Sequence, residues 1–253
     1  MKIAVCIKQV PTREWQPRLR DDKTWIREQD VSYEMNEPDA YALEEALRLR
    51  EKHTGEVVVC SAGPARVQQV IREALARGAD RAIHVEDDSL GAADAFAAAD
   101  ALAGAMAGEQ FDLVLTGLQS DDQGHAATGV VLAERLGVPH ATIIMEVQVE
   151  GGSLRVKREL EGGWFQWIAM PLPALLTIQS GINQLRYATL KGIMAAKKKE
   201  IRKVALPDGL QPVQQVVALA QPSRSKQTHM IGGPPAEAAR ELVKRLREEA
   251  RAL

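Results

Sequence analysis

Residues that could bind a small anionic ligand are concentrated in one polar loop. The loop comprises Gly117, Leu118, Gln119, Ser120, Asp121, Asp122, Gln123, Gly124, His125, Ala126, Ala127 and Thr128. An apolar run at 111–115 precedes it as a buried strand, and an apolar helical pattern at 130–136 follows it and ends at Gly137. Free backbone N–H groups and the helix dipole favour phosphate at such a place, and open α/β sheets bind ligands where their strands end. The loop is therefore interpreted either as a phosphate-binding site or as an ordinary connection between a strand and a helix.

The side chains of this loop limit what it could bind. Backbone N–H groups and the Thr128 hydroxyl at the helix start are the expected phosphate donors. Asp121 and Asp122 would repel a phosphate, so both are expected to turn away from it, although carboxylates could also bind a cation, a ribose or an adenine. His125 is expected to form hydrogen bonds or to face solvent rather than to act as a catalytic base.

Several well-marked function classes find no support in the sequence. The P-loop, the Rossmann glycine fingerprint, the nucleophile elbow and the HExxH zinc motif are all missing from it. No nucleophile–base pair can be named and no zinc-ligand spacing occurs, so we predict no catalytic residues and no metal site. A net charge of −2 gives no global basic field, so no nucleic-acid partner is expected. The one dense basic run, 197–199, is interpreted as the solvated end of a helix.

Cysteine usage and hydropathy indicate the compartment. Cys6 and Cys60 each lie in an apolar strand-like run, which predicts buried thiols in a reducing compartment. The N-terminal apolar run is too short for a signal-peptide core, and no continuous apolar stretch could span a bilayer. We therefore expect a soluble, cytoplasmic protein without direct membrane insertion.

Strand and helix patterns alternate along the first part of the chain. In chain order the expected elements are at 2–7, 36–50, 56–62, 67–78, 81–85, 92–107, 111–115 and 130–136. Asn36 is expected to cap the first helix, with Pro38 in its first turn. Crossovers of this length predict an α/β fold with a mainly parallel, doubly wound (Rossmann-like) sheet and helices on both faces. The long connection after Pro11 is expected to hold a small hairpin or to run irregularly.

The second part of the chain shows a different pattern. Gly-Gly pairs separate three strand-like runs, at 141–149, 154–160 and 164–169, which predicts an added antiparallel hairpin region. A buried run at 174–178 is expected to return to the main sheet, and a loop with a short helix is expected to fill 179–203.

A C-terminal extension completes the expected organisation. An apolar segment at 213–219 is interpreted as a strand, and a terminal helix is expected to start at Pro234 and Pro235. We therefore divide the chain into a nucleotide-binding α/β domain at 1–203 and a C-terminal arm with its helix at 204–253. The arm is expected to dock on its own domain or on a partner subunit.

The run from Val156 to Thr177 resembles the signature of the beta subunit of electron-transfer flavoproteins. The residues at the family's spacings are Val156, Arg158, Glu161, Gly162, Gly163, Gln166, Ile168, Pro173, Leu175, Leu176 and Thr177. The run RYATLKGIMAAKKKEI at 186–201 resembles the family's partner-recognition loop and lysine-rich helix, and the runs at 35–49 and 63–85 match as well. The resemblance covers nearly all of the first two hundred residues.

The resemblance implies a heterodimer whose alpha subunit holds a redox-active FAD, while the beta subunit holds AMP in a structural role and has no catalytic residues. Such a dimer takes electrons from dehydrogenases, typically the acyl-CoA dehydrogenases of fatty acid oxidation, and passes them to a quinone-linked acceptor. The implied nucleotide site comprises Cys6, Asn36, Glu37, Pro38, Asp39, Ala62 and the loop from Gly117 to Thr128. The implied recognition loop lies near 184–199, and its partner-recognition residues are Arg186, Tyr187, Leu190, Ile193 and Met194. Leu190 corresponds to the leucine that enters an apolar pocket on the dehydrogenase.

Some positions depart from the family pattern, and two alternatives stand beside this interpretation. The run from Asn36 to Asp39 differs from the usual Asn-Pro arrangement, Ala127 stands where a glutamine is common, and Lys191 stands where a proline is usual. One alternative is a beta subunit of an electron-bifurcating flavoprotein, with a second FAD in place of AMP. The other is a stand-alone adenine-nucleotide-binding regulatory protein, which predicts a stable monomer.

Overall fold

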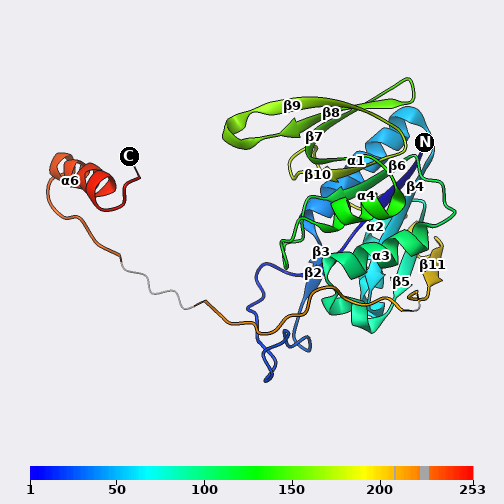
Figure 1. Ribbon diagram of the computed structural model, residues 1–253, viewed down its shortest axis with the longest axis horizontal. Coiled ribbons are helices and arrows are strands. Elements are labelled where there is room, and N and C mark those ends of the chain that lie inside the picture. Colours follow the sequence, from blue (N-terminus) through cyan, green and yellow to red (C-terminus); the bar gives the residue numbers. More distant parts are fainter. Residues whose placement is uncertain (208, 223–227, 253) are drawn as a thin grey trace. The chain divides into compact units, whose positions relative to one another are not determined.

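Within the described residues, nine strands form a single sheet, and two further strands form a small separate one (Figure 1). The computed structural model describes residues 1–207, 209–222 and 228–252, in two units, Met1–Ala218 and Leu219–Leu253. The large sheet belongs to the first unit. Its strands in spatial order are β11 (Ile201–Val204), β5 (Arg81–Glu86), β4 (Glu56–Gly63), β1 (Lys2–Cys6), β6 (Leu113–Gly117), β10 (Ala174–Ile178), β7 (His140–Glu150), β8 (Ser153–Glu159) and β9 (Phe165–Pro171).

The strand directions confirm the expected fold class. From β11 to β7 every neighbouring pair is parallel, whereas β7, β8 and β9 pair antiparallel. The Gly-Gly pair between β7 and β8 forms a turn, and the pair before β9 lies in a short 3-10 helix, η3 (Glu161–Gly163). The sheet is thus mainly parallel with an added antiparallel region at one side.

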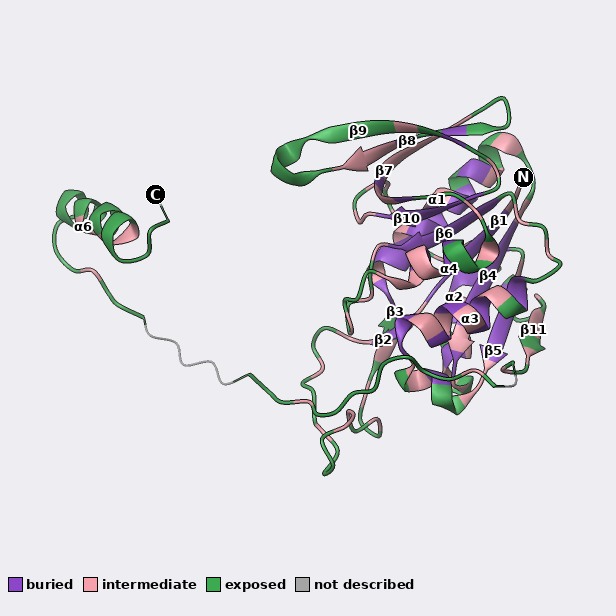
Figure 2. Cartoon of the chain, viewed as in Figure 1, coloured by how far each residue is buried: buried purple, intermediate pink, exposed green. Residues whose placement is uncertain are grey.

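Helices cover both faces of the sheet, whose central strands are largely buried (Figure 2). Residues of these strands alternate between two apolar clusters, one on each face. Ile3 and Val5 of β1 belong to the cluster under α1 (Glu37–His53), α2 (Gln68–Arg77) and α5 (Leu190–Ala196). Ala4 and Cys6 belong to the cluster under α3 (Ala95–Met106) and α4 (Thr128–Leu136). Two 3-10 helices, η1 (Ala65–Val67) and η2 (Asp88–Ala92), complete these connections. Cys6 and Cys60 are free thiols and both are buried, as expected.

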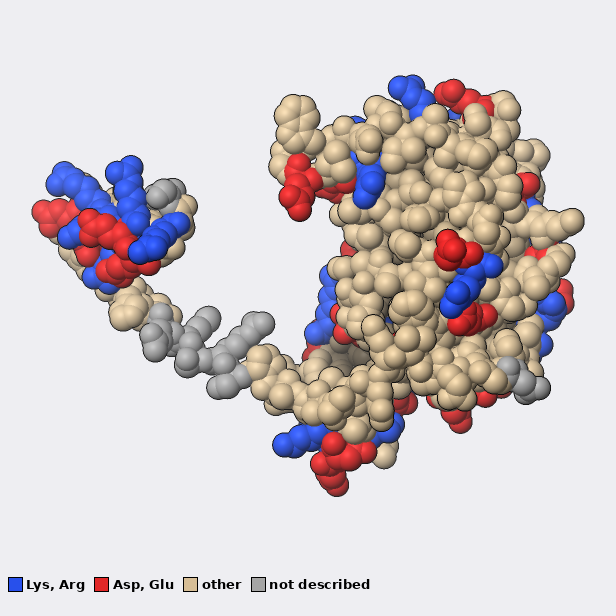
Figure 3. All heavy atoms as spheres, viewed as in Figure 1, with Lys and Arg blue, Asp and Glu red and all other residues tan. Residues whose placement is uncertain are grey.

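The long connection after β1 contains the small hairpin that the sequence allowed. β2 (Gln9–Pro11) and β3 (Tyr33–Met35) pair antiparallel. In the segment that connects these two strands, Leu19 pairs with Ile26 in an isolated antiparallel β-bridge. On the face shown in Figure 3, Lys and Arg side chains alternate with Asp and Glu rather than forming one basic surface.

Two expectations for the later chain were wrong. The segment 213–219 is not a strand: the backbone N–H groups of Val213 and Gln214 each donate to Asp94 Oδ2 at 2.6 Å instead of joining a ladder. Conversely, the end of the expected loop-and-helix segment forms β11, which pairs parallel with β5. An edge strand needs burial on only part of its surface, so β11 can carry the charged Arg202 and Lys203. These two residues interrupt the apolar run by which a buried strand is predicted from sequence.

The second unit contains α6 (Pro235–Glu248), whose start agrees with the expectation from Pro234 and Pro235. Its Leu242 and Val243 side chains are exposed within that unit. Where this arm docks stays a prediction. None of the helices in the described ranges combines the length and hydropathy needed to cross a bilayer.

Candidate functional site

A pocket lies where β1, β4 and β6 end, and it gathers most of the residues that the sequence selected. Those in its lining are Cys6, Asn36, Asp39, Ala62, Gly117, Leu118, Gln119, Ser120, Gln123, His125, Ala126, Ala127 and Thr128. Outside the lining are Glu37, Pro38, Asp121, Asp122 and Gly124. The sequence analysis missed Ile7, Lys8, Leu90, Gly91, Ala93, Asp94, Ala95, Ala98, Leu102, Thr116 and Gly129. Ile7 is the last residue of a predicted strand and Lys8 directly follows it, which was the available signal for them.

Asp39 joins the ends of two strands at the base of the pocket. Its Oδ2 accepts the backbone N–H of Lys8 at 2.7 Å, and its Oδ1 accepts that of Gly117 at 2.9 Å. Burial raises the pKa of Asp39 to about 7, although these hydrogen bonds act in the opposite direction. A side chain at Gly117 would place its Cβ 2.3 Å from Asp39 Oδ1, so only glycine permits this approach.

Asn36 ties the polar loop to the start of α1. It occupies the expected N-cap position, but within the described chain its side chain makes no capping bond. Instead, Asn36 Nδ2 donates to the Gln119 carbonyl and its Oδ1 accepts the Asp121 N–H, both at 2.9 Å. Asn36 is thus the N-cap residue, as predicted, but its side chain bonds the loop after β6, which offers this amide both a donor and an acceptor.

The two loop aspartates lie outside the pocket lining and pair with basic side chains, Lys8 of the lining and Arg13. Asp122 Oδ1 accepts from Lys8 Nζ at 2.7 Å, and Asp121 Oδ2 lies 3.4 Å from Arg13 Nη2. Both carboxylates thus have partners other than a ligand, as the repulsion argument requires. The described residues contain no group of three His, Cys, Asp or Glu side chains placed to hold a metal ion.

The start of α4 supplies donors to the same pocket. No side chain among the described residues caps this helix, whose N-cap residue is Ala127. The N–H groups of a helix's first turn have no intrahelical acceptors, and here, within the described ranges, no side-chain cap accepts from them either. A Cβ on Gly129 would lie 2.6 Å from Thr116 Oγ1, so this glycine lets the helix start close against β6. The arrangement is suited to binding an anion, and Thr128 lies in the lining as expected.

A second surface surrounds the expected recognition loop. The side chains of Tyr187, Leu190, Ile193 and Met194 are exposed, and Leu190 is 83% exposed. Arg186 is different, because its Nε donates to Glu44 Oε2 at 2.8 Å and its Nη1 to Glu51 Oε1 at 2.6 Å. Burial would raise the pKa of Glu44, but hydrogen bonds from arginine hold that pKa below its usual value. Arg186 thus fastens the loop to α1.

Arg72 of α2 caps the C-terminal end of α5, and Lys199, three residues after α5, caps that of α2. Arg72 Nη1 donates to the carbonyls of Ala196 at 2.5 Å and Lys199 at 2.8 Å. In return, Lys199 Nζ donates to the carbonyls of Leu75 at 3.0 Å and Ala79 at 2.5 Å. Lys199 was expected to be solvated together with its neighbours; that was wrong, because α2 ends within reach of its ammonium group.

A family model and individual relatives of this chain all indicate the same protein family. A family model described as the electron transfer flavoprotein domain matches residues 23–209. The electron transfer flavoprotein subunit beta of Methylophilus methylotrophus is 38% identical over 98% of this chain and 98% of its own length. The proteins of the same name are 38% identical over 97% of this chain in Thermoanaerobacterium thermosaccharolyticum and 34% over 90% in Bacillus subtilis. Because the model spans most of the chain and these relatives align over nearly their whole length, the chain belongs to the electron transfer flavoprotein beta-subunit family.

Proposed function

We propose that this chain is the beta subunit of a heterodimeric electron-transfer flavoprotein and that it binds AMP in the pocket where β1, β4 and β6 end. The composition of the lining carries the AMP assignment. Apolar side chains such as Leu90 and Leu102 suit a purine ring, whereas the uncapped start of α4, with Thr128, suits a phosphate. The lining therefore fits a small nucleotide better than a purely apolar or purely ionic ligand.

In this proposal a redox-active FAD is held mainly by the alpha subunit, and this chain has no catalytic residue. When bound, the FAD supplies the electron transfer. The beta subunit holds the nucleotide, joins the alpha subunit and presents a docking surface to the electron donor.

An edge of the sheet supports the assignment of the alpha-subunit interface. β9 is the last strand of the sheet, so in the described chain its outer backbone groups meet no further strand. Its side chains Phe165 and Trp167, and Trp164 just before them, are exposed by 47%, 40% and 75%. Large aromatic side chains beside a free strand edge are suited to a permanent interface, which buries such groups. We assign this edge to the alpha subunit.

The surface around α5 supports docking of a dehydrogenase, typically an acyl-CoA dehydrogenase. Leu190 is an exposed apolar anchor, and the ion pairs of Arg186 with Glu44 and Glu51 hold the preceding loop in place. A small apolar anchor on a fixed base suits a transient contact, which electron exchange with successive partners requires. The electrons then pass to a quinone-linked acceptor.

Cofactor content of the purified heterodimer tests the proposal. The chain is co-expressed with its alpha subunit, and nucleotides released by denaturation are quantified. One AMP and one FAD per dimer are expected. Two FAD molecules without AMP would instead identify an electron-bifurcating flavoprotein, and a stable monomer that binds AMP without any flavoprotein partner would identify a stand-alone regulatory protein.

A further inference from the structure

Lys8 places an ammonium group in the pocket lining at a position that the sequence analysis did not select. Its Nζ donates to Asp122 Oδ1 at 2.7 Å, to Gln123 Oε1 at 2.9 Å and to Ser120 Oγ at 3.4 Å. Its backbone N–H donates to Asp39. The side chain therefore extends from a fixed backbone position across to the polar loop.

Lys8 also carries the one full positive charge among the described residues that line the pocket. The two lining carboxylates, Asp39 and Asp94, each accept backbone N–H groups with both oxygens. The start of α4 adds the equivalent of about half a positive charge. A phosphate that enters this pocket therefore meets Lys8 as its strongest electrostatic partner.

Asp122 competes with such a phosphate for Lys8. The side chains of this ion pair are 36% and 23% exposed, so solvent weakens their attraction. A phosphate dianion carries twice the charge of a carboxylate and can also accept N–H groups at the start of α4. It can therefore draw Lys8 away from Asp122.

We propose that Lys8 makes this pocket select adenine nucleotides with a 5′-phosphomonoester over uncharged nucleosides, and that Asp122 limits the phosphate affinity that Lys8 supplies. This inference rests on the proposed function, because it requires a nucleotide in the pocket. Removal of the Lys8 charge must weaken phosphate recognition, whereas removal of the Asp122 charge must strengthen it. The opposite signs distinguish this role from a structural one, since a disordered loop would weaken binding in both variants.

Calorimetric titration of the nucleotide-depleted heterodimer with AMP and with adenosine tests this inference. In Lys8→Met the Kd for AMP should rise about ten- to hundredfold, the range for a lost charge-assisted hydrogen bond, while the Kd for adenosine stays unchanged. Lys8→Arg should retain most of the AMP affinity. In Asp122→Asn the Kd for AMP should fall by about threefold, and this gain should shrink in the Lys8→Met background. Lys191→Met, an exposed lysine on α5, is the matched control and should bind AMP like the wild type.

Three outcomes of these titrations would overturn the proposed role of Lys8. Equal losses of AMP and adenosine affinity in Lys8→Met would overturn the inference, as would weaker AMP binding in Asp122→Asn. If Lys8→Met does not assemble, the sign of the Asp122→Asn effect alone decides. A wild-type heterodimer that binds neither AMP nor adenosine would overturn the proposed AMP site itself, and the inference with it.

Discussion

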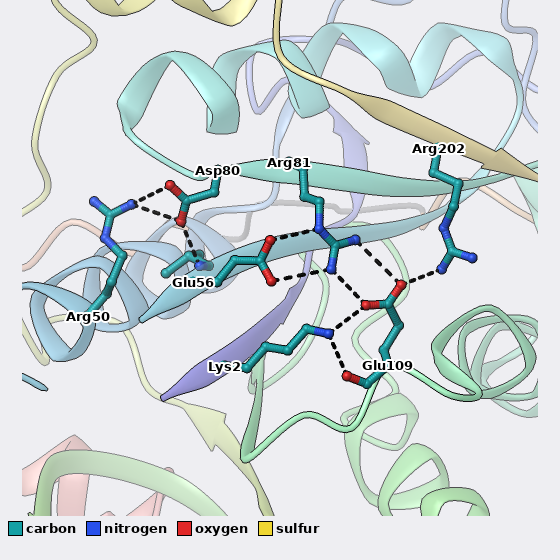
Figure 4. Close-up of polar contacts among 8 residues, drawn as sticks. Lys2, Arg50, Glu56, Asp80, Arg81, Glu109 and Arg202 are labelled. Carbon is teal, nitrogen blue, oxygen red and sulfur yellow. Dashed lines mark hydrogen bonds and ion pairs between the residues drawn. The ribbon is translucent and has the colours of Figure 1, made fainter. Parts of the chain in front are cut away.

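Glu109 should contribute measurable, pH-dependent stability, because it joins three basic side chains from separate strands (Figure 4). Its carboxylate accepts from Lys2 Nζ at 2.8 Å, from Arg81 Nη2 at 2.7 Å and from Arg202 Nη2 at 2.8 Å. The hydrogen bond from Arg81, followed by that from Lys2, lowers the pKa of Glu109 from 4.5 to about 2. These cations arise from β1, β5 and β11, so the pairs connect the starts of strands on both sides of β4.

The magnitude follows from linkage between protonation and folding. A shift from 4.5 to about 2 corresponds to roughly 3 kcal/mol of stability when the carboxylate is ionised in both states. Because the three cations remain partly exposed, solvent screening reduces this value, and we expect Glu109→Gln to lower the free energy of unfolding by about 1–2 kcal/mol at pH 7. The folded-state pKa is depressed, so the contribution is present above pH 4.5 and is lost as pH falls towards 2.

Urea unfolding followed by tryptophan fluorescence measures this difference at pH 7 and at pH 3. The gap between the wild type and Glu109→Gln should shrink by more than half at pH 3. Glu134→Gln, at an exposed position on α4, is the control and should change stability by less than about 0.5 kcal/mol. Equal stability of wild type and Glu109→Gln at pH 7, or a gap that does not change with pH, would refute the reasoning.

Three further predictions concern the two proposed binding surfaces. Leu190→Ala should raise the KM for the heterodimer in a dehydrogenase assay while nucleotide content and dimer formation stay intact; unchanged kinetics with every dehydrogenase tried would contradict the anchor role. Thr128→Val should weaken AMP retention by about 1 kcal/mol through loss of a hydroxyl donor, and equal AMP content after gel filtration would remove Thr128 from the ligand set. Gly117→Ala should lower both AMP content and the urea midpoint, because its Cβ would lie 2.3 Å from Asp39 Oδ1. A variant that keeps both values would show that the loop can shift to admit the methyl group.

The central sheet could be predicted because its strands are buried on both faces. β1, β4 and β6 are continuous apolar runs, and strands of this kind are visible to a hydrophobic pattern. The place of the pocket followed from the same pattern, since parallel strands end at one edge. β11 was not predicted because it is an edge strand with charged side chains, and its pairing with β5 depends on tertiary contacts.

The missing parts of the site depend on contacts between distant segments. Lys8 lies more than a hundred residues from Asp122 in the chain, and no local pattern relates the two. Asp94 shows the same limit: its carboxylate caps α3 at Ala97 and also accepts from Val213 and Gln214. The apolar run at 213–219 was predicted as a strand because the sequence does not show that Asp94 accepts its first backbone N–H groups.

The mutual capping of α2 and α5 has a consequence for how the docking surface moves. α5 has only seven residues and would not persist as an isolated helix in water. Arg72 bonds carbonyls at the end of α5, and Lys199, just after α5, bonds carbonyls at the end of α2, so unwinding of either helix end removes acceptors from a basic group of the other segment. The two helices should therefore open as one cooperative unit, and amides of α5 should exchange hydrogen as slowly as those of α2 rather than at the rate of a surface loop.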